Sequence, residues 1–130
     1  MPELPEVEVS RQGLLPLLRG QRILGAVVRT PRLRHEIPLD LASRLTGLRL
    51  DGILRRGKYL LLDCESSARG GWIILHLGMS GSLRLVPPET PPRKHDHVDL
   101  VFGQSVLRLR DPRRFGAVLW HAGGDVESHP

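Results

Sequence analysis

The sequence contains a single cysteine, Cys64, among 130 residues. One cysteine excludes an internal disulfide and a cysteine-cluster zinc site, and it fits a reducing cytoplasm. No apolar run approaches the roughly 20 residues that a membrane-spanning helix needs. The start is acidic and rich in proline, so it lacks the basic-then-apolar pattern of a secretory signal. We therefore expect a cytoplasmic domain without a membrane partner.

Lysine is also scarce, because Lys58 and Lys94 are the only two. Arginine supplies most of the nineteen basic residues, which oppose fourteen acidic ones and give a net charge of +5. The arginine side chain makes two-pronged contacts with phosphates and base edges, so a nucleic-acid partner is one interpretation. An arginine-rich protein from a GC-rich genome is the other, and charge alone does not decide between them.

Short β-type segments separated by glycine and proline dominate the chain, which at this length is one domain. Strands are expected at Arg22–Arg29, Leu48–Leu54, Lys58–Cys64, Trp72–Leu77, Ser82–Val86, His97–Phe102, Val106–Arg110 and Ala117–His121. Helices are expected at Glu3–Leu18 and Leu39–Leu45, with Gly13 and Pro16 predicting an early end or a kink in the first. The pattern predicts a mainly β fold with flanking helices. We expect a two-layer β-sandwich or flattened barrel of about eight strands, with an N-terminal helix and one short helix.

The first residues combine an amine with carboxylates. Removal of Met1 would leave Pro2 with a free secondary amine, whose pKa of about 8 leaves a nucleophilic fraction at neutral pH. Such an amine can attack an electrophilic carbon and form a cationic iminium. Glu3 and Glu6 lie close enough in sequence to move protons. The alternative is an ordinary chain start in which proline begins a helix.

Five segments, in this order, resemble the bacterial formamidopyrimidine-DNA glycosylases: Met1–Glu8 (MPELPEVE), Gly57–Leu60 (GKYL), His76–Leu83 (HLGMSGSL), Lys94–Leu100 (KHDHVDL) and Asp111–Gly116 (DPRRFG). Each segment alone is a weak signal, whereas the five together are specific. Leu4 favours this family over the related endonuclease VIII branch, which typically has glycine there. The resemblance implies a bacterial repair enzyme of the cytoplasm and nucleoid, acting as a monomer on double-stranded DNA. Such enzymes excise oxidised purines, notably 8-oxoguanine and formamidopyrimidines, and then nick the strand.

The resemblance assigns the catalytic roles to four residues. Pro2 would attack C1′ of the damaged nucleotide, and the resulting iminium would permit β- and then δ-elimination. Glu3 would protonate the sugar ring oxygen or assist ring opening. Glu6 would support the first-turn geometry, although a carboxylate facing the helix dipole is an equal alternative. Lys58 would hold a phosphate or an oxygen of the lesion.

The same resemblance assigns DNA contacts. An enzyme that flips a base out of the stack fills the gap with an apolar wedge, and here Met79, Arg113 and Phe115 would form it. Arg113 would read the orphaned cytosine, while Arg114 and His95 would bind phosphates. The alternative is that these two roles are exchanged between Arg113 and Arg114. Without the resemblance, core packing would be the better interpretation of Met79 and Phe115.

The segment His95-Asp96-His97 concentrates types of residue that bind metals. We expect its two histidines to face apart, so that they do not easily bind one metal ion together. The resemblance places the family's zinc finger in the C-terminal part, so we expect no metal and no cofactor in this chain. Asp96, His97 and Asp99 are expected to make structural hydrogen bonds. His76 is likewise expected to be a structural histidine with its polar atoms satisfied.

The resemblance covers the N-terminal half of these enzymes. Residues 1–130 would form the catalytic domain, with a folded core at 1–121 and the start of an interdomain linker at 122–130. The family's helix–two-turn–helix and zinc-finger domain would be absent. We expect weak, salt-sensitive DNA binding and little glycosylase activity from such a piece. A catalytically silent DNA-binding fragment and, less favoured, an N-terminal-proline tautomerase remain the alternatives.

Overall fold

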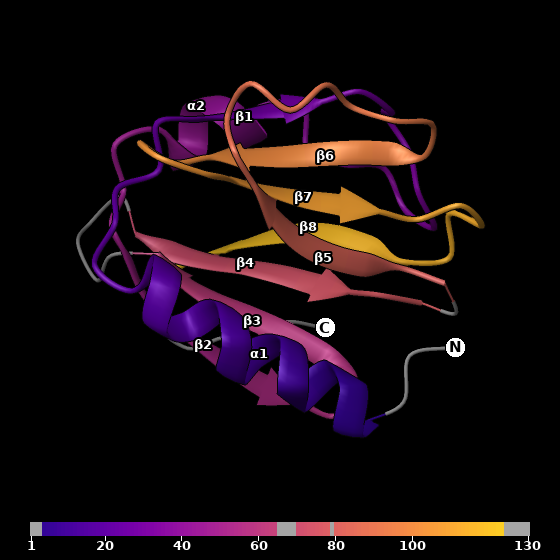
Figure 1. Cartoon of the computed structure of the whole chain (residues 1–130), viewed down its shortest axis with the longest axis horizontal. Coiled ribbons are helices and arrows are strands. Elements are labelled where there is room, and N and C mark those ends of the chain that lie inside the picture. Colours follow the sequence, from indigo (N-terminus) through magenta and orange to yellow (C-terminus); the bar gives the residue numbers. More distant parts are fainter. Residues whose placement is uncertain (1–3, 65–69, 79, 124–130) are drawn as a thin grey trace.

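The computed structural model describes residues 4–64, 70–78 and 80–123. Two four-stranded antiparallel sheets form two layers, with strand orders β1-β6-β7-β5 and β2-β3-β4-β8 (Figure 1). The strands are β1 Gly25–Val28, β2 Leu50–Arg56, β3 Tyr59–Cys64, β4 Gly71–His76, β5 Ser82–Val86, β6 Asp96–Val101, β7 Val106–Arg110 and β8 Ala117–Ala122, and the helices are α1 Leu4–Leu18 and α2 Leu41–Leu45. The sheets do not close on each other, so the expected fold class is confirmed as a sandwich and not a barrel.

The first helix ends at Leu18, as its expected range predicts, in spite of Gly13 and Pro16. Pro16 lies inside α1, so the early end expected from these two residues is wrong. Leu14 and Leu18 are buried and hold the last turn against the core, whereas Pro16 is exposed. This burial outweighs the backbone hydrogen bond that proline removes. Gly20, with φ +85°, then ends the helix in a conformation that glycine adopts easily.

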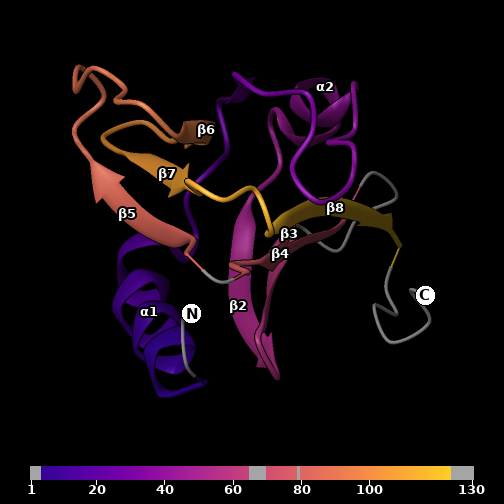
Figure 2. The same ribbon diagram turned by 90° about the vertical axis from the view of Figure 1, so that its right-hand side faces the viewer.

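The core fills the space between the two sheets. Alternate side chains of the strands point inward, as period-two patterning requires. The inward residues include Leu60, Leu62, Ile73, Leu75, Val98, Leu100, Leu107 and Leu109. Figure 2 shows the two helices on opposite sides of the strands, with α1 beside β2. Among the described residues, neither helix is long and apolar enough to cross a bilayer.

The strand registers bring several connections to one end of the sandwich. In one sheet, Tyr59 pairs with His76, and His76 pairs with Ala117. In the other sheet, Arg110 pairs with both Ser82 and Asp96. The β2–β3 turn, the β4–β5 connection, the β7–β8 connection and the residue before β6 therefore lie at this end. The candidate site is built from these connections.

Candidate nucleic-acid interface

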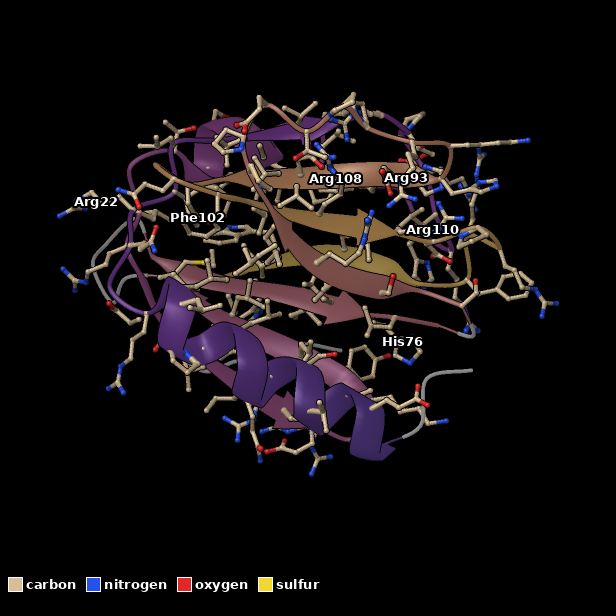
Figure 3. The ribbon with its side chains drawn as sticks, in the orientation of Figure 1. Arg22, His76, Arg93, Phe102, Arg108 and Arg110 are labelled. Atoms are coloured by element: carbon tan, nitrogen blue, oxygen red, sulfur yellow. The ribbon has the colours of Figure 1, made fainter. Side chains whose placement is uncertain are left out.

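Figure 3 shows His76 and Arg110 toward the end of the molecule where these connections gather, with Arg22 at the opposite end. The predicted site residues that the structure describes belong to this end. Pro2, Glu3 and Met79 lie outside the described residues. The functional roles of the other residues stay predictions.

The start of α1 is tied to the turn that carries Lys58. Arg55 Nε donates to Glu8 Oε1 at 2.9 Å, and its Nη1 donates to the carbonyl of Gly57 at 3.1 Å. Gly57, with φ +59°, forms the tight turn before the half-buried Lys58. Glu6 is exposed on α1, two residues before the Glu8 that makes this link. The first turns of α1 and the Lys58 turn therefore belong to one connected unit.

The connection after β4 packs directly against the connection after β7. A Cβ built on Gly78 would lie 2.7 Å from the backbone of Phe115 and of Gly116, so the two backbones are in close contact. The backbone N–H of Arg113 donates to Ser80 Oγ at 3.3 Å. Gly78 and Ser80 flank Met79, so the two turns predicted to carry the wedge lie side by side.

Arg113 and Phe115 form an exposed pair on this loop. The guanidinium carbon of Arg113 lies 5.0 Å from the centre of the Phe115 ring, a cation–π arrangement. Phe115 is 42% exposed, although it is a large apolar residue. An exposed aromatic ring beside a cation is available to stack against a nucleic-acid base.

His95 and Arg114 adopt an unusual backbone conformation. Their φ angles are +74° and +57°, in the left-handed region that non-glycine residues rarely occupy. Such strain persists only where the surrounding structure enforces it. Here the Asp111 N–H donates to the His95 carbonyl at 3.0 Å, and Asp111 Oδ1 accepts the Arg114 N–H at 3.1 Å.

The expectation that His95 and His97 face apart is wrong. Their ring centroids lie 6.1 Å apart at an interplanar angle of 68°. Side chains two residues apart on a strand share a face, so strand alternation does not separate the two rings, and His95 itself lies just before β6. Among the residues that the structure describes, no group of three or more His, Cys, Asp or Glu gathers as metal ligands.

The acidic residues of β6 and His97 make structural hydrogen bonds, as expected. His97 is buried; its Nε2 donates to the Asp111 carbonyl at 3.0 Å, which leaves Nδ1 to accept the Thr30 hydroxyl at 2.8 Å. Burial lowers the pKa of His97 and favours this neutral ring. Asp96 accepts from Arg84, and Asp99 from Arg29 and Arg108.

A hollow of about 280 Å³ opens beside Phe115, with Arg34, His35, Tyr59 and His76 in its wall. His76 Nδ1 accepts the backbone N–H of Gly78 at 3.0 Å, and its ring meets Tyr59 edge-on at 4.7 Å. This agrees with the expectation of a satisfied histidine. Burial lowers the pKa of His76, and the positive charges of Arg34 and Lys58 lower it further.

Sequence reasoning missed Arg34 and His35 at this site. The backbone N–H of Arg34 donates to the carbonyl of Gly116 at 3.1 Å, which fixes the loop before α2 next to the β7–β8 connection. The sequence did carry a local signal for a basic site here, because seven consecutive residues contain Arg29, Arg32, Arg34 and His35. Such a density of basic side chains is typical of a phosphate-facing loop.

The fold and this end of the molecule define a class: a β-sandwich domain whose connecting loops present arginine, lysine and histidine on one edge. Residues 1–118 match the family described as the formamidopyrimidine-DNA glycosylase N-terminal domain. The chain belongs to this family. The match, and a helix that begins at Leu4, argue against the tautomerase alternative, in which Pro2 would begin a strand.

The relatives are similar over the whole of this chain. A formamidopyrimidine-DNA glycosylase of Dechloromonas aromatica is 59% identical over 132 residues, covering 100% of this chain and 48% of the relative. One of Aromatoleum aromaticum is 58% identical over 130 residues, covering 100% and 46%. The chain thus spans about half the length of the curated relatives it matches.

Solved structures are similar in the same way. The Lactococcus lactis formamidopyrimidine-DNA glycosylase, non-covalently bound to DNA containing an abasic site, has a TM-score of 0.86 at 34% identity, with 96% of this chain and 46% of that chain covered. The complex of the Lactococcus lactis enzyme with DNA containing a formamidopyrimidine lesion has a TM-score of 0.84 at 35% identity, with 92% and 44% covered.

Proposed function

We propose that this domain carries the chemistry of base-excision repair on double-stranded DNA in the bacterial cytoplasm and nucleoid. The reaction is removal of an oxidised purine, 8-oxoguanine or a formamidopyrimidine, followed by nicking of the strand through β,δ-elimination. The observation that supports it most is the gathering of Lys58, His95 and the Arg113–Phe115 loop at one end of a domain of this family.

In this proposal Pro2 is the nucleophile. Its secondary amine attacks C1′, the base leaves, and the iminium acidifies the neighbouring C2′ proton so that elimination follows. Glu3 transfers protons at the sugar ring oxygen, and Glu6 supports the amine from the first turn of α1. Lys58 holds a phosphate or an oxygen of the lesion beside this amine.

The remaining proposed residues hold the DNA. Met79, Arg113 and Phe115 fill the space that the flipped nucleotide leaves, with Arg113 against the orphaned cytosine. Arg114 and His95 neutralise backbone phosphates and so set affinity and not sequence preference. We propose that this chain needs no cofactor of its own.

Borohydride reduction of the intermediate tests this function. Intact mass first gives the fraction of chains from which Met1 is removed. The chain is then incubated with an oligonucleotide duplex containing an abasic site and sodium borohydride, which reduces an iminium to a stable amine. We expect a covalent complex whose adduct maps to Pro2, in the tryptic peptide that ends at Arg11.

Two comparisons make the result decisive. A form that retains Met1 has an amide at Pro2 and should give no adduct, while it still binds the duplex. Glu3→Gln should still be trapped, because an abasic site already offers an aldehyde, but should excise 8-oxoguanine more slowly. An adduct that maps to Lys58 or Lys94 would show that Pro2 is not the nucleophile. DNA binding by the processed chain without any adduct would support the silent DNA-binding alternative.

A further inference from the structure

Asp111 follows β7 and is fully buried, with 0% of its surface exposed. Each of its polar atoms has a partner. Its N–H donates to the His95 carbonyl at 3.0 Å, and its carbonyl accepts from His97 Nε2 at 3.0 Å. Its carboxylate accepts the Ser80 hydroxyl at 3.3 Å and the Arg114 N–H at 3.1 Å on Oδ1, and the Gly116 N–H at 2.8 Å on Oδ2.

These bonds join three segments that are far apart in the sequence. His95 precedes β6, Ser80 lies between β4 and β5, and residues 112–116 connect β7 to β8. Ser80 also accepts the Arg113 N–H at 3.3 Å, so its hydroxyl bridges the loop to the carboxylate. The carboxylate of Asp111 thus connects the Ser80 turn to the loop that bears Arg113 and Phe115, and the backbone N–H of Asp111 adds the segment that bears His95.

The backbone segments around the carboxylate are packed so closely that only glycine fits at two positions. A Cβ on Gly116 would lie 2.4 Å from the His76 carbonyl and 2.8 Å from Asp111 Oδ2. A Cβ on Gly78 would lie 2.7 Å from the backbone of both Phe115 and Gly116. The glycines allow the close approach, and the carboxylate holds it by hydrogen bonds.

We propose that Asp111 is a positioning residue: its buried carboxylate holds the Arg113–Phe115 loop and the Ser80 turn in the geometry that fits a DNA duplex with a missing base. It touches no DNA itself. The proposal rests on the proposed function and adds a residue to it. The carboxylate fixes the backbone of a loop whose own side chains stay exposed, so the loop is ordered before DNA binds.

The hydrogen bonds themselves argue for this role over simple stabilisation. All three donors to the carboxylate belong to the connections, and none belongs to a strand. Arg114 has φ +57°, and its N–H donates both to this carboxylate at 3.1 Å and to the Asp111 carbonyl at 3.2 Å. Asp111→Asn replaces one acceptor oxygen by an NH₂ group, which must then face either the Gly116 N–H or the Arg114 N–H. Loss of this geometry should alter the loop while leaving both sheets intact.

The experiment compares the full chain with Asp111→Asn, Ser80→Ala and the core variant Ile53→Val. Ile53 is buried in β2, away from the loops, and serves as a control for loss of stability. Two duplexes are used, one with a tetrahydrofuran abasic-site analogue opposite cytosine and one undamaged. For Asp111→Asn, we expect affinity for the abasic duplex to fall about tenfold and affinity for the undamaged duplex to change less than twofold. Ser80→Ala should show the same loss of preference to a smaller extent, and Ile53→Val should keep the preference of the parent chain.

Amide hydrogen exchange without DNA gives a second readout. The Arg114 and Gly116 amides should exchange faster in Asp111→Asn than in Ile53→Val at matched melting temperature. Equal loss of affinity for both duplexes, or unchanged exchange at these amides, would overturn the positioning role. If Asp111→Asn does not fold, a Ser80→Ala chain that retains the full preference overturns it as well. If the parent chain itself does not prefer the abasic duplex, both the proposed function and this role are overturned. If the parent chain has the preference and Asp111→Asn keeps it, only the positioning role is overturned.

Discussion

At the scale of single residues, Glu8 joins α1 to the β2–β3 hairpin. Its carboxylate accepts hydrogen bonds from Arg11, Gln12 and Arg55. These bonds, that from Arg11 above all, lower the pKa of Glu8 from 4.5 to about 2. A carboxylate with a depressed pKa in the folded state stabilises the fold above its unfolded pKa, and this contribution is lost as the pH falls toward about 2.

The Glu8 link predicts a pH-dependent difference between variants. Glu8→Gln should unfold at lower urea concentration than the parent chain at pH 6. The difference should shrink between pH 4.5 and 2, because the parent side chain then becomes neutral too. Glu89→Gln, at an exposed turn position, serves as the control. If the urea midpoints of Glu8→Gln and the parent chain differ by the same amount from pH 6 to pH 2.5, the hydrogen-bonded Glu8 carboxylate is not the source of this stability.

Gly116 illustrates a residue whose lack of a side chain matters. Gly116→Ala should destabilise the domain by about 1–3 kcal/mol, because the new methyl group overlaps backbone and carboxylate atoms that are held in place. Gly52→Ala, with nothing within 4 Å of the added Cβ, should change stability by less than about 1 kcal/mol. Thermal unfolding of both variants measures the contrast, and equal melting temperatures would refute it.

At the scale of elements, Arg108 holds the proline-rich segment 87–94 against the outer face of the β1-β6-β7-β5 sheet. Arg108 is 3% exposed and donates to Asp99, to the carbonyl of Thr90 at 3.0 Å and to that of Pro91 at 3.3 Å. Burial opposes ionisation of Asp99, but hydrogen bonds from Arg29 and Arg108 outweigh it and lower the pKa of Asp99. The segment thus lies over the sheet because the buried guanidinium of Arg108 donates hydrogen bonds to two of its carbonyls.

Removal of one partner from this buried pair should be costly. Arg108→Met should destabilise the domain by about 3 kcal/mol, because Asp99 loses a partner and two carbonyls lose their donor. Arg44→Met removes a helix-surface pair with Asp40 that is about half exposed, and should cost under about 1 kcal/mol. Urea unfolding measures both, while limited proteolysis should cut segment 87–94 faster in Arg108→Met only. Equal destabilisation by the two variants would contradict this.

At the scale of the whole molecule, basic side chains cluster at the end where the connections meet. If this end faces DNA, affinity should fall steeply with salt, because each neutralised phosphate releases counterions. We expect roughly 10- to 100-fold weaker binding at 200 mM than at 50 mM salt. Arg114→Gln should lower the slope of log Kd against log salt by about one. Arg22→Gln, at the opposite end of the molecule (Figure 3), should leave the slope unchanged, and an equal change for both variants would contradict this orientation.

Most of the fold was predictable because the strands follow period-two patterning and the turns carry glycine or proline. β5 and β7 have the bounds that the sequence predicts, and the sandwich is confirmed. Pro16 was misjudged because local propensity was weighed without the burial of Leu14 and Leu18. The orientation of His95 relative to His97 was misjudged because side chains two residues apart on a strand lie on the same face and not on opposite faces.

The sequence by itself determined the class of fold, the family and the motifs that suggest chemistry, because these depend on local patterns and on the order of residues. Only the tertiary structure decided that Ser80, His95 and Asp111 meet, and that Arg34 lies beside Phe115. The physical reason is register. Hydrogen bonds between strands distant in the sequence select which connections share an end of the sandwich, and a buried carboxylate shows its importance only once its donors surround it.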